Sequence, residues 1–545
     1  MNGFDADVLV VGAGPTGLTL ARELHSLGVT VQLVDRAADA VHESRALAIQ
    51  ARTLEVLARN GLAQDLVTAG RPTGQVMLHG SSRTRILPLG DAATADTGFP
   101  FLLFLAQSAT ERILVDRLSM VGAGVRRGLT LTALSQDQDG VTCTLESPGV
   151  PARVVRTRYV VGCDGAHSAT RRLTGIQFSG HAFPHRFLLA DLEIDGLVHD
   201  RGRRTGVKRV GIRSDSAHAY LTGDGPMFLF PLGTPASWRL IVQLPVDVPT
   251  DADPSALLRE IVARYSRGRL VPHEPVWLTE FSISSRLADE FHRDRVFLAG
   301  DAAHIHSPAG AQGMNTGMQD AVNLGWKLAL VCRGDASPTL LRSYPDERMP
   351  VARSVLTRTD RAFRLATSGV PVLRSLRAAV VGRVAGLVSR SEPARRAAFR
   401  LIAQLDVSYP VSPLSVEGEP RLIDGPRVGE RYPTVTPTQP AAARATVDRP
   451  VFRLLLCGPA QYWPEPTVQT IQDTWAHLID VERRPHAPVS RWSEAASPHD
   501  AAAQYLLRWD GYVGYRAAGT DLAGVEAYLV GLGGRARAPR PGSAR

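Results

Sequence analysis

The first 35 residues show the apolar and polar pattern of a parallel β–α–β unit. Residues 7–11 (DVLVV) form a short apolar run that is typical of a buried parallel strand. Leucines then recur four and three residues apart, which predicts a helix with one buried face that ends at Gly28. A second apolar run, residues 29–34, predicts the next strand and leads directly into Asp35. Units of this kind hold ligands at the carboxyl ends of their strands.

Two later apolar runs also end in polar loops. Residues 159–161 lead to Asp164-Gly165, and residues 296–299 lead to Gly300-Asp301. A long helix is predicted from Gly313 to about Arg333. Between these regions, three apolar runs indicate strands of a mainly antiparallel sheet. They are residues 187–194, 226–232 and 238–244.

The last 135 residues read as a separate unit. Residues 410–450 are rich in proline and turn residues, which indicates a linker or a loop-rich entry. The pattern that follows predicts a strand, a helix, a hairpin around Asp510-Gly511 and a final helix. Their expected ranges are 451–457, 468–479, 505–509 with 512–516, and 522–532. We see no internal repeats.

Composition narrows the class of protein. With 545 residues the chain exceeds the roughly 250–300 residues that one core supports, so we expect several domains. Apolar residues make up 44% and charged residues 21%, as in ordinary soluble proteins. The formal charge is +9, but the basic residues are scattered and almost all are arginine. Net charge is therefore the only feature that would favour a nucleic-acid partner, and we expect none.

The cysteines and the lengths of the apolar runs indicate in which cellular compartment the protein is expected. The four cysteines form no CxxC pair, which fits neither a disulfide framework nor a zinc site. No secretory signal is visible, and no apolar run approaches the ~18 residues that span a bilayer. We therefore expect a cytoplasmic protein without a membrane segment.

The strongest chemical signal is the glycine-rich turn after the first predicted strand, Gly12-Ala13-Gly14-Pro15-Thr16-Gly17. In a GxGxxG turn the first glycine permits the tight turn, the second admits a pyrophosphate, and the third lets helix and strand pack closely. The helix N-terminus then offers free N–H groups to the phosphates. Asp35 lies at the distance along the chain where an acid accepts hydrogen bonds from a ribose. This pattern alone does not decide between NAD and FAD.

The three motifs together resemble the class A flavoprotein monooxygenases, the group of para-hydroxybenzoate hydroxylase, phenol hydroxylase and polyketide aromatic hydroxylases. The resemblance rests on GAGPTG at 12–17, CDGAHS at 163–168 and GDAAHIHSPAGAQGMNTG at 300–317. It implies an α/β fold: a Rossmann-like FAD-binding domain with an inserted, mainly antiparallel substrate domain and a C-terminal thioredoxin-like domain. The last domain lacks the redox CxxC, so a structural or dimer-contact role is expected.

The resemblance also implies which residues hold the cofactor. In that family the residue corresponding to Asp301 contacts the ribityl chain, and the helix beginning near Gly313 points its N-terminus at the flavin pyrimidine edge. Asp164 belongs to a segment associated with FAD and NAD(P)H. The candidate cofactor residues are Gly12, Gly14, Pro15, Thr16, Gly17, Asp35, Arg36, Arg45, Gln107, Asp164, Gly300, Asp301, Pro308, Gly313, Met314 and Asn315.

The same resemblance gives domain boundaries. The FAD-binding domain would comprise residues 1–75, 102–175 and 280–370, and the substrate domain residues 76–101 and 176–279. A helical connector would follow at 371–410, then the thioredoxin-like domain at 411–534 and a disordered tail at 535–545.

Several residues have two interpretations. His304 and His306 could be metal ligands, but no third ligand is near in sequence, so we expect loop packing and no metal. Residues 373–388 interleave apolar and basic positions, which suits either a membrane surface or, as we expect, packing on the protein itself. His181, His185, Arg213 and Tyr220 could line the substrate pocket or lie on the surface. We identify no base or nucleophile.

The expected function is therefore FAD-dependent hydroxylation of an aromatic substrate with O2 and NADPH or NADH, through a flavin C4a-hydroperoxide. The chain is longer than the simple benzoate hydroxylases of that family. The resemblance therefore favours a larger phenolic substrate, such as a polycyclic polyketide. Alternatives are a Baeyer–Villiger or antibiotic-inactivating flavin monooxygenase, a flavin reductase without oxygen chemistry, and a non-catalytic FAD-binding partner in a biosynthetic complex. A homodimer is possible within this family pattern.

Overall fold

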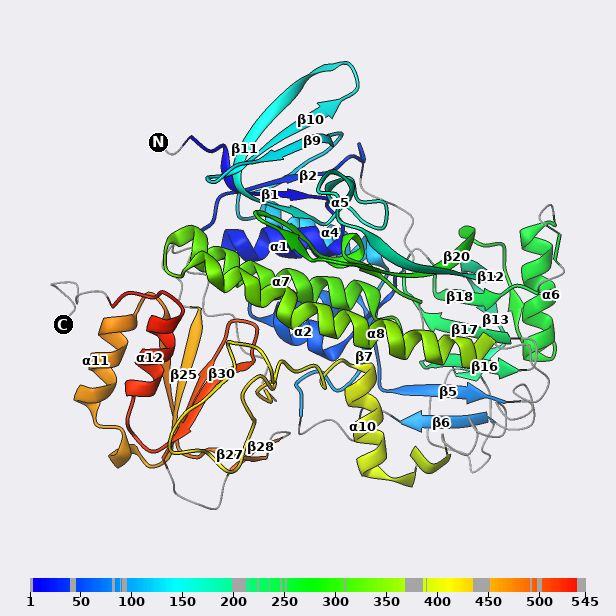
Figure 1. The fold of residues 1–545 in the computed structure, drawn as a ribbon. Coiled ribbons are helices and arrows are strands. Elements are labelled where there is room, and N and C mark those ends of the chain that lie inside the picture. Colours follow the sequence, from blue (N-terminus) through cyan, green and yellow to red (C-terminus); the bar gives the residue numbers. More distant parts are fainter. Residues whose placement is uncertain are drawn as a thin grey trace.

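Three sheets organise the chain, and Figure 1 shows them as separate layers joined by long helices. This computed structural model describes residues 3–39, 46–80, 84–88, 90, 96–198, 212–213, 215–222, 225–234, 236–245, 248–249, 252–307, 310–367, 386–388, 390–434, 451–490, 493–496 and 502–536. The α/β class predicted from the sequence is confirmed.

The first sheet carries the nucleotide-binding pattern. Its parallel strands lie in the order β22-β11-β1-β2-β8, because β1 pairs with both β11 and β2. Their bounds are β22 (Val296–Leu298), β11 (Val150–Gly162), β1 (Ala6–Val11), β2 (Val31–Val34) and β8 (Val125–Arg126). The antiparallel strands β9 (Thr130–Gln136), β10 (Val141–Ser147) and β21 (His292–Arg293) extend it. The sequence did not indicate this β9–β10–β11 extension.

Helix α1 (Pro15–Ser26) packs against this sheet, and helix α7 (Gly313–Arg333) packs against α1. Helix α1 begins within the glycine turn and buries its leucine face, as the leucine spacing predicted. Helix α7 has the predicted bounds and is buried along almost its whole length. Its Gly325 lets it approach α1, since a Cβ there would lie 3.0 Å from the Cβ of Glu23. Figure 1 shows α1 and α7 lying side by side below the sheet.

The second sheet is mainly antiparallel, with the order β23-β20-β12-β18-β17-β16-β5-β6. The bounds are β23 (His304–Ile305), β20 (Trp277–Ala288), β12 (Phe178–Leu192), β18 (Trp238–Gln243), β17 (Gly225–Pro231), β16 (Ala217–Thr222), β5 (Gln75–His79) and β6 (Thr84–Pro88). Helix α6 (Pro254–Ser266) shares a separate apolar core with one face of this sheet. Strand β20 runs across the domain boundary that we expected at residue 280.

The C-terminal sheet has the order β24-β30-β29-β25-β26. The bounds are β24 (Val416–Glu417), β30 (Val513–Ala518), β29 (Ala503–Leu507), β25 (Phe452–Cys457) and β26 (Ile479–Arg484). Helix α11 (Glu465–Trp475) joins the parallel pair β25 and β26, and α12 (Ala523–Gly531) follows the β29–β30 hairpin. The helix expected over 468–479 therefore begins and ends earlier, because Leu478 and Ile479 are buried at the start of a strand.

The remaining helices surround these sheets. They are α2 (Ala51–Ala58), α3 (Leu62–Ala69), α4 (Gln107–Ser119), α5 (Ala169–Leu173), α8 (Ser343–Thr367), α10 (Glu392–Ile402), η2 (Gly300–Ala302), η3 (Pro338–Arg342) and η4 (Ala460–Tyr462). The short strands are β3 (Ala48–Ile49), β4 (Arg71–Thr73), β7 (Leu102–Phe104), β13 (Ile194–Asp195), β14 (Leu197–Val198), β15 (Ile212–Arg213), β19 (Val271–Pro272), β27 (Pro488–Ser490) and β28 (Ser493–Ala496).

Two predictions fall largely outside the described residues. The run at 373–388 is described only at 386–388, and the tail at 535–545 only at its first two residues. In the part of the chain that is described, no helix is both long enough and apolar enough to cross a bilayer.

Candidate functional site

A cavity of about 600 Å³ lies between the nucleotide-binding motifs and the second sheet. All three motifs contribute to its lining. Among the residues predicted from sequence, those that line it are Gly14, Pro15, Thr16, Gln107, Asp301, Gly313 and Met314. The CDGAHS segment contributes Cys163 and Gly165. The fold therefore brings segments that lie up to 300 residues apart in the sequence, at Gly14 and at Met314, to the wall of one cavity.

The glycine turn has the shape needed to hold a phosphate-bearing group. Gly12 has a φ of +103°, and a Cβ there would lie 2.3 Å from the Cys163 carbonyl oxygen. A Cβ at Gly17 would lie 1.9 Å from the Gly12 oxygen, so both positions require glycine for packing. At Gly14 a Cβ would meet nothing within 4 Å, although the residue lines the cavity. The turn thus leaves open space beside a helix N-terminus, which is where pyrophosphates bind.

Asp35 stabilises this turn from the end of β2. Its Oδ2 accepts a hydrogen bond from the Ala13 N–H at 2.6 Å, and its Oδ1 accepts one from the Ala37 N–H at 2.8 Å. A carboxylate oxygen accepts more than one hydrogen bond, so a ribose contact stays a prediction. Arg36 is exposed, and neither residue lines the cavity.

Asp164 organises the second motif. Its Oδ2 accepts hydrogen bonds from the Thr170 N–H at 3.0 Å and the Thr170 hydroxyl at 3.1 Å, and its Oδ1 accepts one from the Ser168 hydroxyl. Ser168 in turn caps helix α5 through the Arg171 N–H. Asp164 thus holds Cys163 and Gly165 at the cavity wall and does not line the cavity itself.

The Gly300-Asp301 loop is held in place by the buried carboxylate of Asp320 on α7. Asp320 of α7 accepts hydrogen bonds from the Gly300 N–H at 3.1 Å, His304 Nε2 at 2.7 Å and Arg348 Nε at 2.6 Å. Burial alone would raise the pKa of Asp320, but Arg348 and His304 hold that pKa below its usual value. Asp301 itself is exposed and lines the cavity.

The contacts of His304 favour a packing role. Its Nε2 is bound to Asp320, and both side chains are fully buried. Across the described ranges, no group of three or more histidine, cysteine or acidic residues has a metal-binding arrangement. Asp320 was missing from the candidate residues, although an acid within a predicted buried helix is a signal that could have identified it.

The N-terminus of α7 is tied to the loop around Ala48. Asn315 is buried, its Oδ1 accepts a hydrogen bond from the Gln50 N–H at 2.8 Å, and its Nδ2 donates to the Ala48 oxygen at 2.8 Å. Asn315 therefore orients the start of α7, while Gly313 and Met314 face the cavity.

Gln107 begins helix α4 at the cavity. Its Nε2 donates to Glu111 Oε1 at 2.8 Å, which leaves its carbonyl oxygen available as an acceptor for a ligand hydroxyl. Burial raises the pKa of Glu111. Arg45 and Pro308, the remaining candidates, lie outside the described residues.

The opposite wall of the cavity is apolar and comes mostly from the second sheet. Phe228 and Phe230 of β17 are stacked with centroids 5.9 Å apart, and Phe104 lies 5.3 Å from Phe230. Small residues of β16 beside them leave room for a ligand. The apolar lining residues from this side are Val76, Phe104, Phe187, Ala217, Ala219, Phe228, Phe230, Ile241 and Phe363.

The four substrate-pocket candidates do not line this cavity. Tyr220 lies on the other face of β16, stacked on His79 at 4.2 Å, and Arg213 pairs with Asp215 at 2.7 Å. His181 and His185 line a separate, open groove beside the end of α8. His306, for which loop packing was expected, lines the cavity, as does His218, which the sequence did not single out. Burial lowers the pKa of His306 to about 4, so this imidazole is neutral at pH 7. Period-two alternation separates the faces of β16, but the sequence could not say which face meets the cavity.

Comparison with known proteins agrees with this geometry. Residues 5–359 match the family described as "FAD binding domain". The chain belongs to this FAD-binding family. A full-length relative named 12-dehydrotetracycline 5-monooxygenase/anhydrotetracycline 6-monooxygenase, from Streptomyces rimosus subsp. rimosus, is 36% identical over 94% of this chain and 96% of its own.

Two further relatives cover different shares of the chain. A 6-methylpretetramide 4-monooxygenase from Streptomyces rimosus is 38% identical over 361 residues, which are 66% of this chain and 62% of that relative. Among solved structures, an anhydrotetracycline hydroxylase from Streptomyces rimosus superposes with a TM-score of 0.71 at 31% identity, over 97% of this chain and 100% of that one. The family recognised from the three motifs is therefore confirmed.

Proposed function

We propose that this protein is an FAD-dependent monooxygenase that uses O2 and NADPH or NADH to hydroxylate a polycyclic phenolic substrate. One observation carries the proposal: a single cavity joins a wall of cofactor-binding motifs to a wall of aromatic side chains. The relatives whose names give 6-methylpretetramide, 12-dehydrotetracycline and anhydrotetracycline as substrates support a polyketide-like substrate.

The residues on the motif wall fit FAD. The open space at Gly14 and the N-terminus of α1 suit its pyrophosphate, and the Gln107 carbonyl oxygen suits a ribose or ribityl hydroxyl. Asp301, held in place through Gly300 and Asp320, suits the ribityl chain. The N-terminus of α7 at Gly313 and Met314 supplies a positive dipole that stabilises an anionic ring edge. When bound, FAD supplies the redox and oxygen chemistry that amino-acid side chains lack.

The aromatic wall supplies binding and water exclusion. Planar rings pack favourably against Phe228, Phe230 and Phe104, since aromatic pairs contribute beyond the area they bury. An apolar wall also excludes water, which protects reactive intermediates from side reactions. Among the described lining residues the ionisable side chains are few, and His306 is neutral at pH 7, so the site favours an uncharged polycycle over a benzoate.

The domain division follows from the same reading. We propose that residues 1–75, 102–175 and about 289–370 form the FAD-binding domain and that the second sheet forms the substrate domain. The order β26-β25-β29-β30, with α11 and α12, supports a thioredoxin-like C-terminal domain. A dimer contact for this domain stays a prediction.

The test is an absorbance spectrum of the purified protein, followed by oxidation of NADPH and NADH with and without aromatic compounds. We expect bound flavin, faster oxidation with polycyclic phenols than with benzoates, and one atom of labelled O2 in a new ring hydroxyl. A lactone product would instead establish Baeyer–Villiger chemistry. Oxidation that no aromatic stimulates would indicate a reductase, and a protein that binds no FAD would overturn the proposal.

A further inference from the structure

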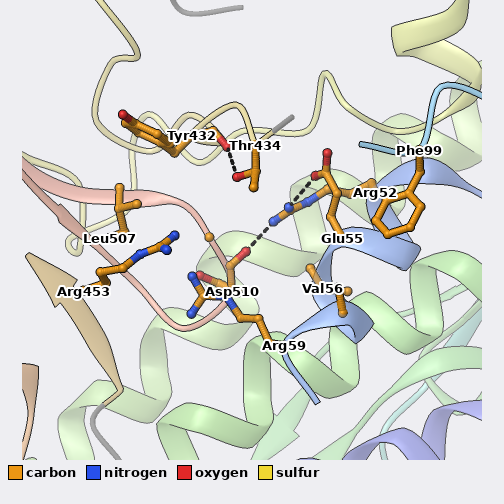
Figure 2. A pocket seen from close by; sticks show the side chains of 12 residues that line it. Arg52, Glu55, Val56, Arg59, Phe99, Tyr432, Thr434, Arg453, Leu507 and Asp510 are labelled. Atoms are coloured by element: carbon orange, nitrogen blue, oxygen red, sulfur yellow. Dashed lines mark hydrogen bonds and ion pairs between the residues drawn. The ribbon is translucent and has the colours of Figure 1, made fainter. Parts of the chain in front are cut away.

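The turn between β29 and β30 leaves the C-terminal sheet and enters the FAD-binding region. We call residues Arg508–Gly511 the docking turn. Its Trp509 Nε1 donates to Glu23 of α1 at 2.7 Å, and Arg52 of α2 donates to the Asp510 carbonyl oxygen. Figure 2 shows the hydrogen bond from Arg52 of α2 to the main chain of Asp510, with Glu55 beside Arg52. These residues line a small cavity of about 30 Å³. The turn thus contacts two helices of the nucleotide-binding layer.

The contact of the docking turn with α7 and α8 is charged and fully buried. Arg508 binds both oxygens of Glu347 on α8, at 2.6 and 2.8 Å. Glu347 also accepts hydrogen bonds from Lys327 at 2.8 Å and Asn323 at 2.7 Å on α7. The side chains of Arg508, Glu347 and Lys327 have an exposed fraction of 0%. Burial alone would raise the pKa of Glu347, but Arg508 and Lys327 hold that pKa well below its usual value.

A second ion pair lies between this cluster and the cofactor loop. Arg348 follows Glu347 on α8 and binds Asp320, the carboxylate that accepts the Gly300 N–H. The second nitrogen of Arg348 donates to the Tyr409 hydroxyl at 2.9 Å, and Arg508 lies 5.4 Å from the Tyr409 ring. The C-terminal unit is thereby linked to the Gly300-Asp301 loop through the adjacent residues Glu347 and Arg348 of α8 and through the Tyr409 ring.

Stability alone does not require charges at this junction. Apolar residues of similar volume often stabilise a buried contact as well as an ion pair does, because burial removes the hydration of both ions. A buried charged set differs in that its hydrogen bonds are satisfied in one geometry only. The buried charges between the docking turn, α7 and α8 therefore suit a contact that has to hold these helices in one position beside the cofactor loop.

We propose that the docking turn is a positioning element of the cofactor site, with Arg508 as its main positioning residue. It fixes α7 and α8 relative to each other, and through Arg348 and Asp320 it fixes the Gly300-Asp301 loop. The inference rests on the proposed binding of FAD at that loop. The C-terminal unit then contributes to cofactor affinity without touching the cofactor.

The test compares two buried arginines of the C-terminal unit, Arg508 in the docking turn and Arg516 on β30. Arg508→Met removes the contact with Glu347, whereas Arg516→Met removes an ion pair with Glu417 at 2.7 Å that stays within the C-terminal unit. We expect Arg508→Met to weaken FAD binding about tenfold and to change the visible circular dichroism of bound flavin. Arg516→Met should lower the melting temperature yet leave FAD affinity and the flavin spectrum unchanged. Arg508→Lys should restore part of the affinity.

A milder variant covers the case in which Arg508→Met does not fold. Asp510→Asn keeps the main-chain contact with Arg52 and weakens the contacts of the carboxylate with Arg508 and Asn323, so we expect about a threefold loss of FAD affinity. If Arg516→Met lowers FAD affinity as much as Arg508→Met at equal loss of stability, the docking turn is merely structural and the proposal fails. FAD binding by the wild type reports separately on the proposed function, and its absence would overturn both.

Discussion

The two walls of the central cavity recognise ligands in different ways. The motif wall is made of main chain and small residues, such as Gly14, Thr16 and Gly313, whose positions are set by close packing behind them. The sheet wall is made of side chains, among them Phe228, Phe230 and Phe187. Main-chain recognition demands particular residue types at fixed spacing, whereas an apolar wall tolerates any residues of suitable size. A cofactor shared by a family thus leaves a motif, and a substrate particular to one member does not.

The largest expected effect is a loss of FAD affinity without a loss of stability, at a glycine of the motif wall. Gly14→Val places its side chain in open space, so the protein should fold with a melting temperature near that of the wild type. The same side chain would occupy the space for the pyrophosphate, and FAD affinity should fall at least about 100-fold. Fluorescence titration of the apoprotein with FAD measures the affinity, and thermal unfolding measures the stability.

The neighbouring glycine supplies the matched control. Gly17→Val would bring its Cβ within 1.9 Å of the Gly12 oxygen, so it should disrupt the turn itself and give little folded protein. A Gly14→Val protein that binds FAD normally would mean that the cofactor lies elsewhere in the cavity.

The next effect concerns the sheet wall and uses two adjacent residues of β17. Phe228 faces the cavity, while Leu229 is buried in the core on the other face. Phe228→Ala should raise the KM for a polycyclic substrate about tenfold, because stacking is lost, with FAD affinity unchanged. Leu229→Ala should lower the free energy of unfolding by about 2–4 kcal/mol and leave KM unchanged. Equal effects of both variants on KM would contradict the assignment of the wall.

The same contrast explains which parts could be predicted from the sequence. The bounds of α7, the parallel strands β1, β2 and β22, the end of β11 and the cavity-lining residues at 14–16 follow from spacing and residue type. Asp35, Asp164 and Asn315 are also where expected along the chain, but they hold loops in place rather than line the cavity. Whether a polar side chain faces a ligand or the protein depends on tertiary contacts that one motif does not contain.

The sheet wall could not be predicted because its residues have no fixed spacing. Tyr220 looked suited to a pocket, yet its neighbours Ala217 and Ala219 face the cavity, since side chains alternate along β16. The docking turn was predicted as a hairpin at Asp510-Gly511, but nothing local indicates that Arg508 pairs with a glutamate 161 residues away. Long-range pairs of this kind are decided by the packing of whole units.

A smaller effect is expected at the polar edge of the motif wall. Asp301→Asn keeps the shape of the side chain and removes its charge, so the ribityl hydroxyls would lose a charge-assisted acceptor. Because Asp301 is exposed, the loss should be about 1 kcal/mol, or roughly fivefold in FAD affinity. Asp289→Asn, an exposed aspartate that bonds Ser179 away from the cavity, is the control and should leave the affinity unchanged. An unaltered affinity in Asp301→Asn would argue against the ribityl contact.

The smallest effect at neutral pH concerns His218 of β16, which is buried and belongs to the lining of the sheet wall. Its Nε2 donates to the Arg213 oxygen at 2.7 Å and its Nδ1 accepts from His79 at 3.0 Å. Burial lowers the pKa of His218 to about 4, below the ~6.5 of an unfolded chain. Below pH 6.5 the imidazole is therefore protonated in the unfolded state but stays neutral in the folded state. The free energy of unfolding falls as the pH drops toward 4. His218→Gln keeps a donor and cannot titrate, so the wild type should lose about 1 kcal/mol relative to it between pH 7.5 and pH 6, measured by denaturant unfolding. Parallel pH profiles for the two proteins would mean that His218 is not held neutral by this wall.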